Sequence, residues 1–458
     1  MPPKDLIEYH KKGSYPSHKG KVFGLLVVFG LFVAFGAYSL WELWQEYGTQ
    51  VMTFLNDIGL PDILTASIWY LIGAAVGLIM LSVIMGIAAA AAARRLGGTL
   101  IYIGAAFMLI VTWSIPVLML VSGVSFSALL SSWPVMIPGL VVLFILVLML
   151  TIWKDRVRRA GEIIKLTGQV CLDEKGVFIP PLLAMVFTLV SALLWGAIIL
   201  QFTPEQVLMG NAELTVENGW PLGVGFILYL FLTIFFYNFA YGTSSAITYI
   251  YIRGRDPSLG DGVKASLSVI GGLIVLSIMS VIVAIIRMII RAISRKSGPG
   301  GRAIGSAASG ILGWVWMLVN YFTIPSMVAE ELSATKGIKR SAGMVRKNFV
   351  DVMIKETAVR WGFTVLAIFI FLGFAFGGFV AGYFLSGDIF VGLIFAILAI
   401  VFAGIPATLV LRTFDIVYVT LLYVFIRRKE GTVKGKTEIP SSMSKELDSA
   451  YQKAQRSG

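Results

Sequence analysis

Long apolar runs separated by short polar segments make up most of this chain. The runs are each close to the roughly 20 apolar residues that an α-helix needs to cross a bilayer. They lie at residues 22–44, 68–92, 100–122, 134–153, 179–201, 221–250, 264–287, 308–329, 358–385 and 389–412. The pattern predicts an all-α, polytopic transmembrane helix bundle with about ten spans.

The segment after the eighth run has a helical rather than a continuous apolar pattern. Its apolar positions recur at helical spacing, at Ile338, Ala342, Val345 and Phe349. Cations occupy the other faces, namely Lys336, Lys339, Arg340, Arg346 and Lys347. A helix of this kind lies in a membrane interface with its cations toward the lipid headgroups.

A short pattern recurs in three basic segments. They read Ile164-Lys165-Leu166-Thr167, Val263-Lys264-Ala265-Ser266 and Ile338-Lys339-Arg340-Ser341. An apolar residue follows five positions after each lysine (Val170, Val269 and Met344), and each segment precedes two spans. This predicts three units, each a basic amphipathic interfacial helix followed by a hairpin. The predicted parts are a basic cytoplasmic tail (1–21), a four-span bundle (22–153), the six-span module (154–428) and a polar cytoplasmic tail (429–458).

The charges of the loops predict the orientation of the spans. Residues 45–67 and 202–220 carry acidic side chains and no lysine or arginine, whereas the loops at 94–95, 154–165, 253–264 and 336–347 are basic. Cytoplasmic loops are enriched in lysine and arginine. We therefore expect a multi-pass protein of the plasma membrane with both termini and the basic loops in the cytoplasm.

One basic stretch does not fit that orientation. Arg287, Arg291 and Arg295 share one helix face, and with Lys296 and Arg302 they would lie outside if the seventh and eighth spans both cross. The sequence favours one helix over 264–296, about 50 Å long, that projects past the bilayer. The alternative is a break at Gly271–Gly272. The arginine face would contact lipid phosphates or another anion, or it is simply a solvated helix end.

Composition narrows the functional classes. Of 458 residues, 57% are hydrophobic and only 14% are charged, against about 25% in soluble proteins. The net charge is +12, and the lysines and arginines cluster between the apolar runs. This indicates a membrane surface and not a nucleic acid as partner. Cys171 is the only cysteine, and His10 and His18 are the only histidines. With no HExxH, GxSxG or P-loop motif, we expect no cofactor, no metal and no enzymatic activity.

Polar residues at membrane depth are the remaining candidates for a site, because burying them is costly without partners. They are Asn238 with Tyr241, Asn320, and the pair Arg412 and Asp415, which are three residues apart on one helix face. They would form a polar solute path, or alternatively they satisfy neighbouring helices as ordinary hydrogen bonds.

Small residues at helical spacing mark faces where helices approach closely. The pairs are Gly73 and Gly77 in the second span and Gly373 and Gly377 in the ninth. They predict packing within the chain, or alternatively a homo-oligomer face.

Residues 155–428 resemble an uncharacterised family of prokaryotic six-span membrane proteins. The resemblance rests on the segment Tyr251–Lys264, on Thr323-Ile324-Pro325 with Glu330, and on the two runs from Lys339 to Ala342 and from Arg346 to Phe349. More distantly, the segment from Ser341 to Asn348 and the ten-span layout are similar to the choline-transporter-like family. That family has a large loop after its first span, which residues 45–67 are too short to match.

Two functional classes follow from these observations. The first is a transporter or channel for a small solute or lipid, with its path near Asn238, Asn320, Arg412 and Asp415. The second is a non-transporting scaffold that binds partners or anionic lipid through basic interfacial helices. Its headgroup contacts would be Lys165, Lys264, Arg287, Arg291, Arg295, Lys339, Arg340, Arg346 and Lys347.

Overall fold

The computed structural model describes residues 19–57, 68–208, 213, 215–253, 256–296 and 298–429. All regular elements in these residues are helices, which confirms the all-α prediction. Nine of the described helices are long and apolar enough to cross a membrane, or ten if a bent pair is one span. The chain is a multi-pass membrane protein. Most of the two predicted tails, with His10 and His18, lies outside the described residues.

The described helices form two compact units that interleave along the chain. Unit 1 comprises Met1–Ile79, Ile179–Ile247 and Pro257–Gly343. Unit 2 comprises Met80–Phe178, Thr248–Asp256 and Met344–Gly458. Each unit draws on both halves of the chain, and the predicted boundary near residue 154 stays a prediction about the sequence.

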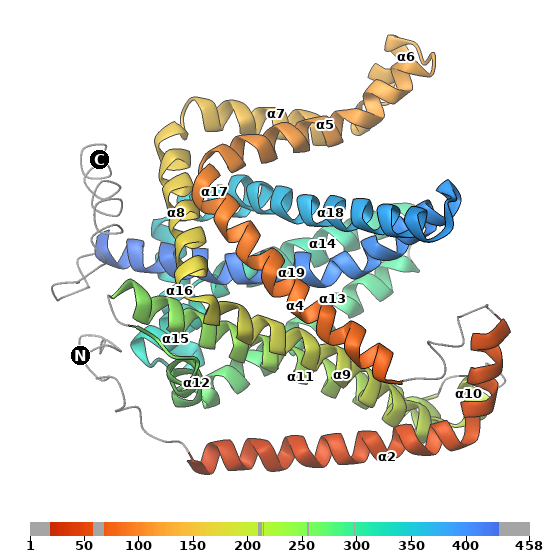
Figure 1. The fold of residues 1–458 in the computed structure, drawn as a ribbon. Helices are drawn as coiled ribbons and strands as arrows, with labels where there is room; N and C mark the ends of the chain where they lie inside the picture. Colours follow the sequence, from red (N-terminus) through yellow and green to blue (C-terminus); the bar gives the residue numbers. More distant parts are fainter. Residues whose placement is uncertain are drawn as a thin grey trace. The chain divides into compact units, whose positions relative to one another are not determined.

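Unit 1 contains two long parallel helices, α2 (Lys19–Asp57) and α9 (Ile179–Phe202). Ring centroids of Phe29 and Phe187 lie 5.1 Å apart, and those of Phe35 and Phe202 lie 5.9 Å apart. Residue numbers therefore rise together along the pair, which Figure 1 shows at the red and yellow-green helices. Parallel spans require an odd number of crossings between them, and the predicted second, third and fourth spans supply three.

The other long helices of unit 1 are arranged as neighbouring antiparallel spans. These are α11 (Val216–Ile252) and the hairpin of α13 (Ile270–Arg295) and α14 (Gly298–Asn320). The short α15 (Thr323–Glu330) follows α14. Asn238 of α11 contacts Ser277 of α13. Thr243 of α11 contacts Ser266, which precedes α13 in the chain. The far end of α13 therefore lies at the same end of unit 1 as the start of α11.

Unit 2 is built on the hairpin of α18 (Arg360–Ser386) and α19 (Ile389–Lys429). This hairpin packs against α5 (Thr99–Val121), and α5 also contacts α7 (Ile137–Leu150). Gly104 makes the first contact possible, because a Cβ there would lie 2.5 Å from the Trp361 backbone carbon. Figure 1 shows the hairpin in two shades of blue, with its turn at the same end as α6 (Phe126–Ser131).

The predicted fourth span is shorter than expected. Its α-helical part, α7, has only 14 residues, and the chain then bends by 91° into α8 (Lys154–Asp173). Gly161 of α8 lies on the turn between α4 (Ile68–Leu96) and α5, since a Cβ there would meet the Gly98 Cα at 2.5 Å. Thus α7 returns the chain to the end of unit 2 where α5 begins, which favours counting it as a crossing.

The predicted continuous helix over 264–296 is wrong. The chain forms α12 (Leu259–Ser268) and then α13, with a non-helical Val269 (φ −105°, ψ 15°) between them. A capping box of Ser258 and Asp261 starts α12, whose residues Ala265 and Ser266 are buried. The 26-residue α13 alone is about 39 Å long, which fits a single crossing with its headgroup regions.

Each of the three basic segments of the repeat lies on a helix that precedes two long apolar helices. The helices are α8, α12 and α16 (Ala334–Lys347). The hydroxyl residue of each repeat is fully buried (Thr167, Ser266 and Ser341), and each apolar residue that follows is buried too (Val170, Val269 and Met344). Lys165 and Lys339 are exposed and Lys264 is half-buried. The repeated pattern therefore encodes which face packs on the protein.

Candidate functional site

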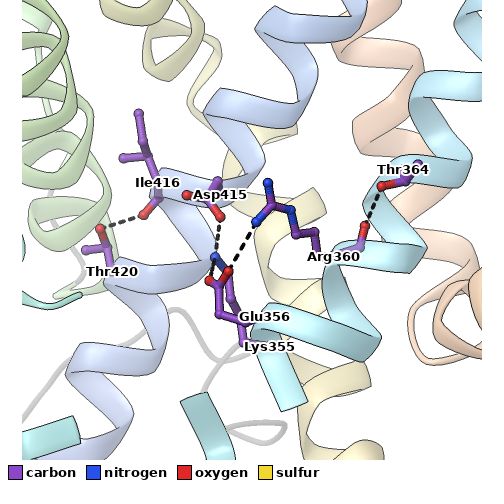
Figure 2. A network of polar contacts seen from close by, with 7 residues as sticks. All are labelled: Lys355, Glu356, Arg360, Thr364, Asp415, Ile416 and Thr420. Carbon is purple, nitrogen blue, oxygen red and sulfur yellow. Dashed lines mark hydrogen bonds and ion pairs between the residues drawn. The ribbon is translucent and has the colours of Figure 1, made fainter. Parts of the chain in front are cut away.

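A cluster of four charged side chains in unit 2 is the most concentrated polar site within an apolar helix pair (Figure 2). The Lys355 ammonium contacts Asp415 of α19 and donates to the Glu356 carboxylate at 2.7 Å. The second Glu356 oxygen accepts from Arg360 at 3.4 Å. Two cations and two carboxylates thus form a cluster with no formal net charge.

A change in helix type positions this cluster. After α17 (Phe349–Ile354) the chain makes a π-helical turn over Lys355–Val359 before α18 begins. A π turn adds one residue to the helical repeat and shifts the faces on either side of it. Lys355 and Glu356 therefore need not continue the apolar face of α18: Lys355 contacts Asp415, and Glu356 lies between Lys355 and Arg360. Such turns are frequent at functional sites.

The cluster is buried on one side and open on the other. Lys355 is only 2% exposed, and the Glu356 side chain is 11% exposed. The Asp415 side chain is 40% exposed. A lone buried ammonium would be costly, so the two carboxylates stabilise its charge, and Asp415 connects the cluster to the surroundings of the protein.

The lipid-facing surface of the hairpin gives the depth of the cluster. Exposed large apolar side chains on α18 and α19 run from Phe369 to Phe402, and none follows Phe402 in the described part of α19. Asp415 lies about 39 Å along α19 from Ile389, at about 1.5 Å per residue. This exceeds the roughly 30 Å of a hydrocarbon core, so the cluster lies at headgroup level and not at the midplane.

A second ion pair in unit 2 joins α8 to α17. Asp351 contacts Arg156 at 3.1 Å and Arg159 at 3.8 Å. These three residues line a recess together with the buried Tyr418 of α19. The basic helix α8 is thereby held at the same end of unit 2 as the Lys355 cluster.

Three residues of the predicted polar path belong to unit 1. Asn238 is 7% exposed and donates to the Ser277 hydroxyl at 2.9 Å. Tyr241 is also buried. Asn320 donates to the Trp316 carbonyl of its own helix at 3.0 Å. The Asn238 contact is an interhelical hydrogen bond, which favours the packing alternative over a solute path at that residue.

The remaining two residues of the predicted path lie on α19 in unit 2. Arg412 is exposed, and Asp415 contacts Lys355. The pairing of Arg412 with Asp415 stays a prediction. Lys355 and Glu356 were not among the predicted site residues, because the predicted ninth span begins at residue 358. The candidate membrane helix in fact begins at Phe349, so a Lys-Glu pair inside its first turns was the available signal.

The cations of α16 are on its outer surface. Lys336, Lys339, Arg346 and Lys347 are exposed. The opposite face packs on the protein and not on lipid: Met344 and Val345 are buried, and the Ser341 hydroxyl accepts from the Phe322 N–H at 2.8 Å. The contact of these cations with lipid headgroups stays a prediction, whereas most of the apolar face packs on the protein and not on lipid.

Arg340 has a role different from that of its neighbours on α16. Its Nε donates at 3.2 Å to Glu330 of α15, whose side chain is almost completely buried. It stabilises a buried carboxylate inside unit 1, so its assignment as a headgroup contact competes with this ion pair.

Acidic side chains of α2 and of the short α10 (Glu205–Leu208) meet at one end of unit 1. Glu42, Glu46 and Glu205 line an open pocket with Trp44 and Tyr47. The three predicted headgroup arginines, Arg287, Arg291 and Arg295, lie on the α13–α14 hairpin at the same end of this unit.

The glycine pairs differ in what they contact. A Cβ added at Gly77, Gly373 or Gly377 would have no atom within 4 Å, and the surroundings of Gly73 lie outside the described residues. The next pair on α18, Gly378 and Gly382, packs tightly on Phe395 of α19. The predicted homo-oligomer face stays a prediction.

Comparison with known proteins gives a family match over the C-terminal part of the chain. Residues 222–433 match a family of unknown function (DUF6159). The matched part includes α12, α13, α14, α16 and the Lys355 cluster. No curated protein matches the chain.

Proposed function

We propose that this membrane protein binds anionic lipid headgroups through α8, α12 and α16 and acts as a non-transporting scaffold at the cytoplasmic face of the plasma membrane. The observation that carries the proposal is the division of faces on these helices. Their hydroxyl and apolar repeat residues are buried, whereas Lys165 and Lys339 are exposed.

Chain order supports a common side of the membrane for the three helices. Two membrane-length helices separate α8 from α12, and two more separate α12 from α16. Two crossings return a chain to the side that it left, so all three helices lie on one side. Each lysine or arginine close to an anionic leaflet contributes about 1 kcal/mol of attraction.

The proposal is tested by reversing only the exposed cations of α16. The variant changes Lys336, Lys339, Arg346 and Lys347 to Glu and leaves Arg340, because removing it would expose the buried Glu330 charge. Binding of phosphatidylglycerol to the full chain in detergent is measured by native mass spectrometry, with phosphatidylcholine as the neutral lipid.

We expect the affinity for phosphatidylglycerol to fall by at least about tenfold in this variant. A matched control exchanges lysine and arginine at the same four positions, which keeps every charge and should keep the affinity. Unchanged phosphatidylglycerol binding after the reversal, or equal affinity for phosphatidylcholine, would contradict the proposal.

The Lys355 cluster supports a second candidate function, the transport of a small cation or proton. Lys355 is a buried ionisable group between two carboxylates, one of which is partly exposed, and the distant choline-transporter-like resemblance bears on this alternative. Asp415→Asn would abolish flux in liposomes, whereas Asp388→Asn at the exposed hairpin turn would leave it unchanged. Absence of flux by the unaltered protein excludes this candidate.

A further inference from the structure

Two arginines of α13 are held by one serine of α14. The Arg287 Nε donates to the Ser309 carbonyl at 3.0 Å, and the Arg291 Nε donates to the Ser309 hydroxyl at 2.9 Å. Ser309 is completely buried. Because both bonds end on a single residue, the two guanidinium groups lie side by side on the surface of the hairpin.

A glycine provides the space for the first guanidinium. A Cβ at Gly313, one turn beyond Ser309, would lie 2.5 Å from the Arg287 Cζ and within 2.8 Å of both Nη atoms. The Arg287 guanidinium therefore lies directly against the α14 backbone. Its Nε is used by the protein, and its Nη atoms have no acceptor in the part of the chain that the structure describes.

No carboxylate in the described part of the chain pairs with the arginines of this site. The sequence contains no aspartate or glutamate from residue 262 to residue 329. Among the described residues, no ion pair involves Arg287, Arg291, Arg295 or Arg302. Adjacent like charges at a membrane boundary repel one another, so an anion that binds both arginines is favoured.

The location of the site is unexpected for a membrane protein. Arg287 lies about 26 Å along α13 from Ile270, at about 1.5 Å per residue, and so near the far edge of the hydrocarbon core. That end of unit 1 also carries the acidic segments. Lysine and arginine are normally enriched in the cytoplasmic loops, on the opposite side of the membrane. The positive-inside rule therefore does not explain these arginines.

We propose that Arg287 and Arg291 form a preformed site for a phosphate group, occupied by the headgroup of an anionic lipid in the leaflet opposite α12. Arginine binds phosphate oxygens through two parallel N–H donors, and here the Nε bonds already fix the orientation of both side chains. Ile289 and Ile293 are exposed on the same helix, where acyl chains would pack beside the bound headgroup.

This site is independent of the scaffold proposal, because it uses other residues at the other end of the spans. The test measures phosphatidylglycerol binding by the full chain in detergent with native mass spectrometry. The test variant is R287Q/R291Q. The matched control, R295Q/K296Q, removes the same charge from the same hairpin but leaves the two anchored arginines.

We expect R287Q/R291Q to lower the affinity for phosphatidylglycerol by at least about tenfold, and the control to lower it less than about threefold. A further variant, R287K/R291K, keeps the charge and loses the planar fork, and it should bind as weakly as the glutamine variant. Thermal unfolding of every variant shows whether the hairpin remains folded.

Gly313→Ala keeps all charges and displaces the Arg287 guanidinium, so it tests the geometry should the double variants fail to fold. Loss of affinity in this variant supports the site, and unchanged affinity overturns it. Equal losses in R287Q/R291Q and R295Q/K296Q would also overturn it, because they would indicate diffuse attraction. Inorganic phosphate is added as a competitor to distinguish the two possible ligands. If it displaces the lipid, the ligand is free phosphate; if it does not, the ligand is the lipid headgroup.

Discussion

The buried charge of Lys355 makes this residue the most sensitive polar position in unit 2. Replacing it with methionine leaves Glu356 without its closest cation in a largely buried place. We expect a loss of about 3 kcal/mol in the free energy of unfolding, measured from thermal or denaturant unfolding in detergent.

The comparison for this prediction is the partner on the exposed side. Asp415→Asn should cost about 1 kcal/mol or less, because its side chain is 40% exposed and solvent screens the pair. A larger effect at Asp415 than at Lys355 would contradict the assignment of Lys355 as the buried centre of the cluster.

Replacing Ser341 tests whether the buried hydroxyl of the repeat stabilises the fold through its hydrogen bond. Ser341→Ala removes the acceptor of the buried Phe322 N–H, which should lower the free energy of unfolding by about 1–3 kcal/mol. The exposed Ser306, inside α14, is the control, and its replacement by alanine should change stability by less than about 0.5 kcal/mol. Equal effects would show that the repeat hydroxyl has no packing role.

Close helix packing in unit 2 depends on glycine at one position. Gly104→Ala would place a Cβ 2.5 Å from the Trp361 backbone, which cannot move as a side chain can. We expect α5 and α18 to separate and the protein to lose about 1–3 kcal/mol.

Gly373 on α18 is the matched control, because a Cβ there meets nothing within 4 Å. Gly373→Ala should stabilise the helix by about 0.5–1 kcal/mol if no second copy covers this face. Destabilisation by Gly373→Ala would instead indicate a close contact with another copy of the chain. Both outcomes are measured by thermal unfolding.

The elements that could be predicted are those marked by a clear pattern in the amino-acid sequence. Span-length apolar runs and the Lys-x-hydroxyl repeat determine helices almost locally, and the structure has helices at each of them. The break at Val269 was missed because residues 264–295 contain no proline and no acidic residue to mark a boundary, and tertiary packing decides where the helices separate. The Lys355–Asp415 contact joins residues 60 positions apart across two helices, and no local pattern contains it.

At the scale of the whole molecule, the central question is which side of the membrane each basic helix occupies. The parallel α2 and α9 and the packing of Gly161 on Gly98 both favour counting α7 as a crossing. With ten crossings, α8, α12 and α16 share one side, and the Arg287 site is on the other. The scaffold proposal and the proposed leaflet of the Arg287 site both rest on this arrangement.

Single-cysteine labelling measures that arrangement most directly. Cys171 is buried, and burial raises the pKa of its thiol, so the native chain gives little background with a membrane-impermeant thiol reagent. Cysteine is placed in turn at Lys165, Lys264, Lys339 and Arg295. We predict that the first three positions react only from the cytoplasmic side and position 295 only from the other side. Reaction of any one of the three lysine positions from the side of position 295 would contradict the account.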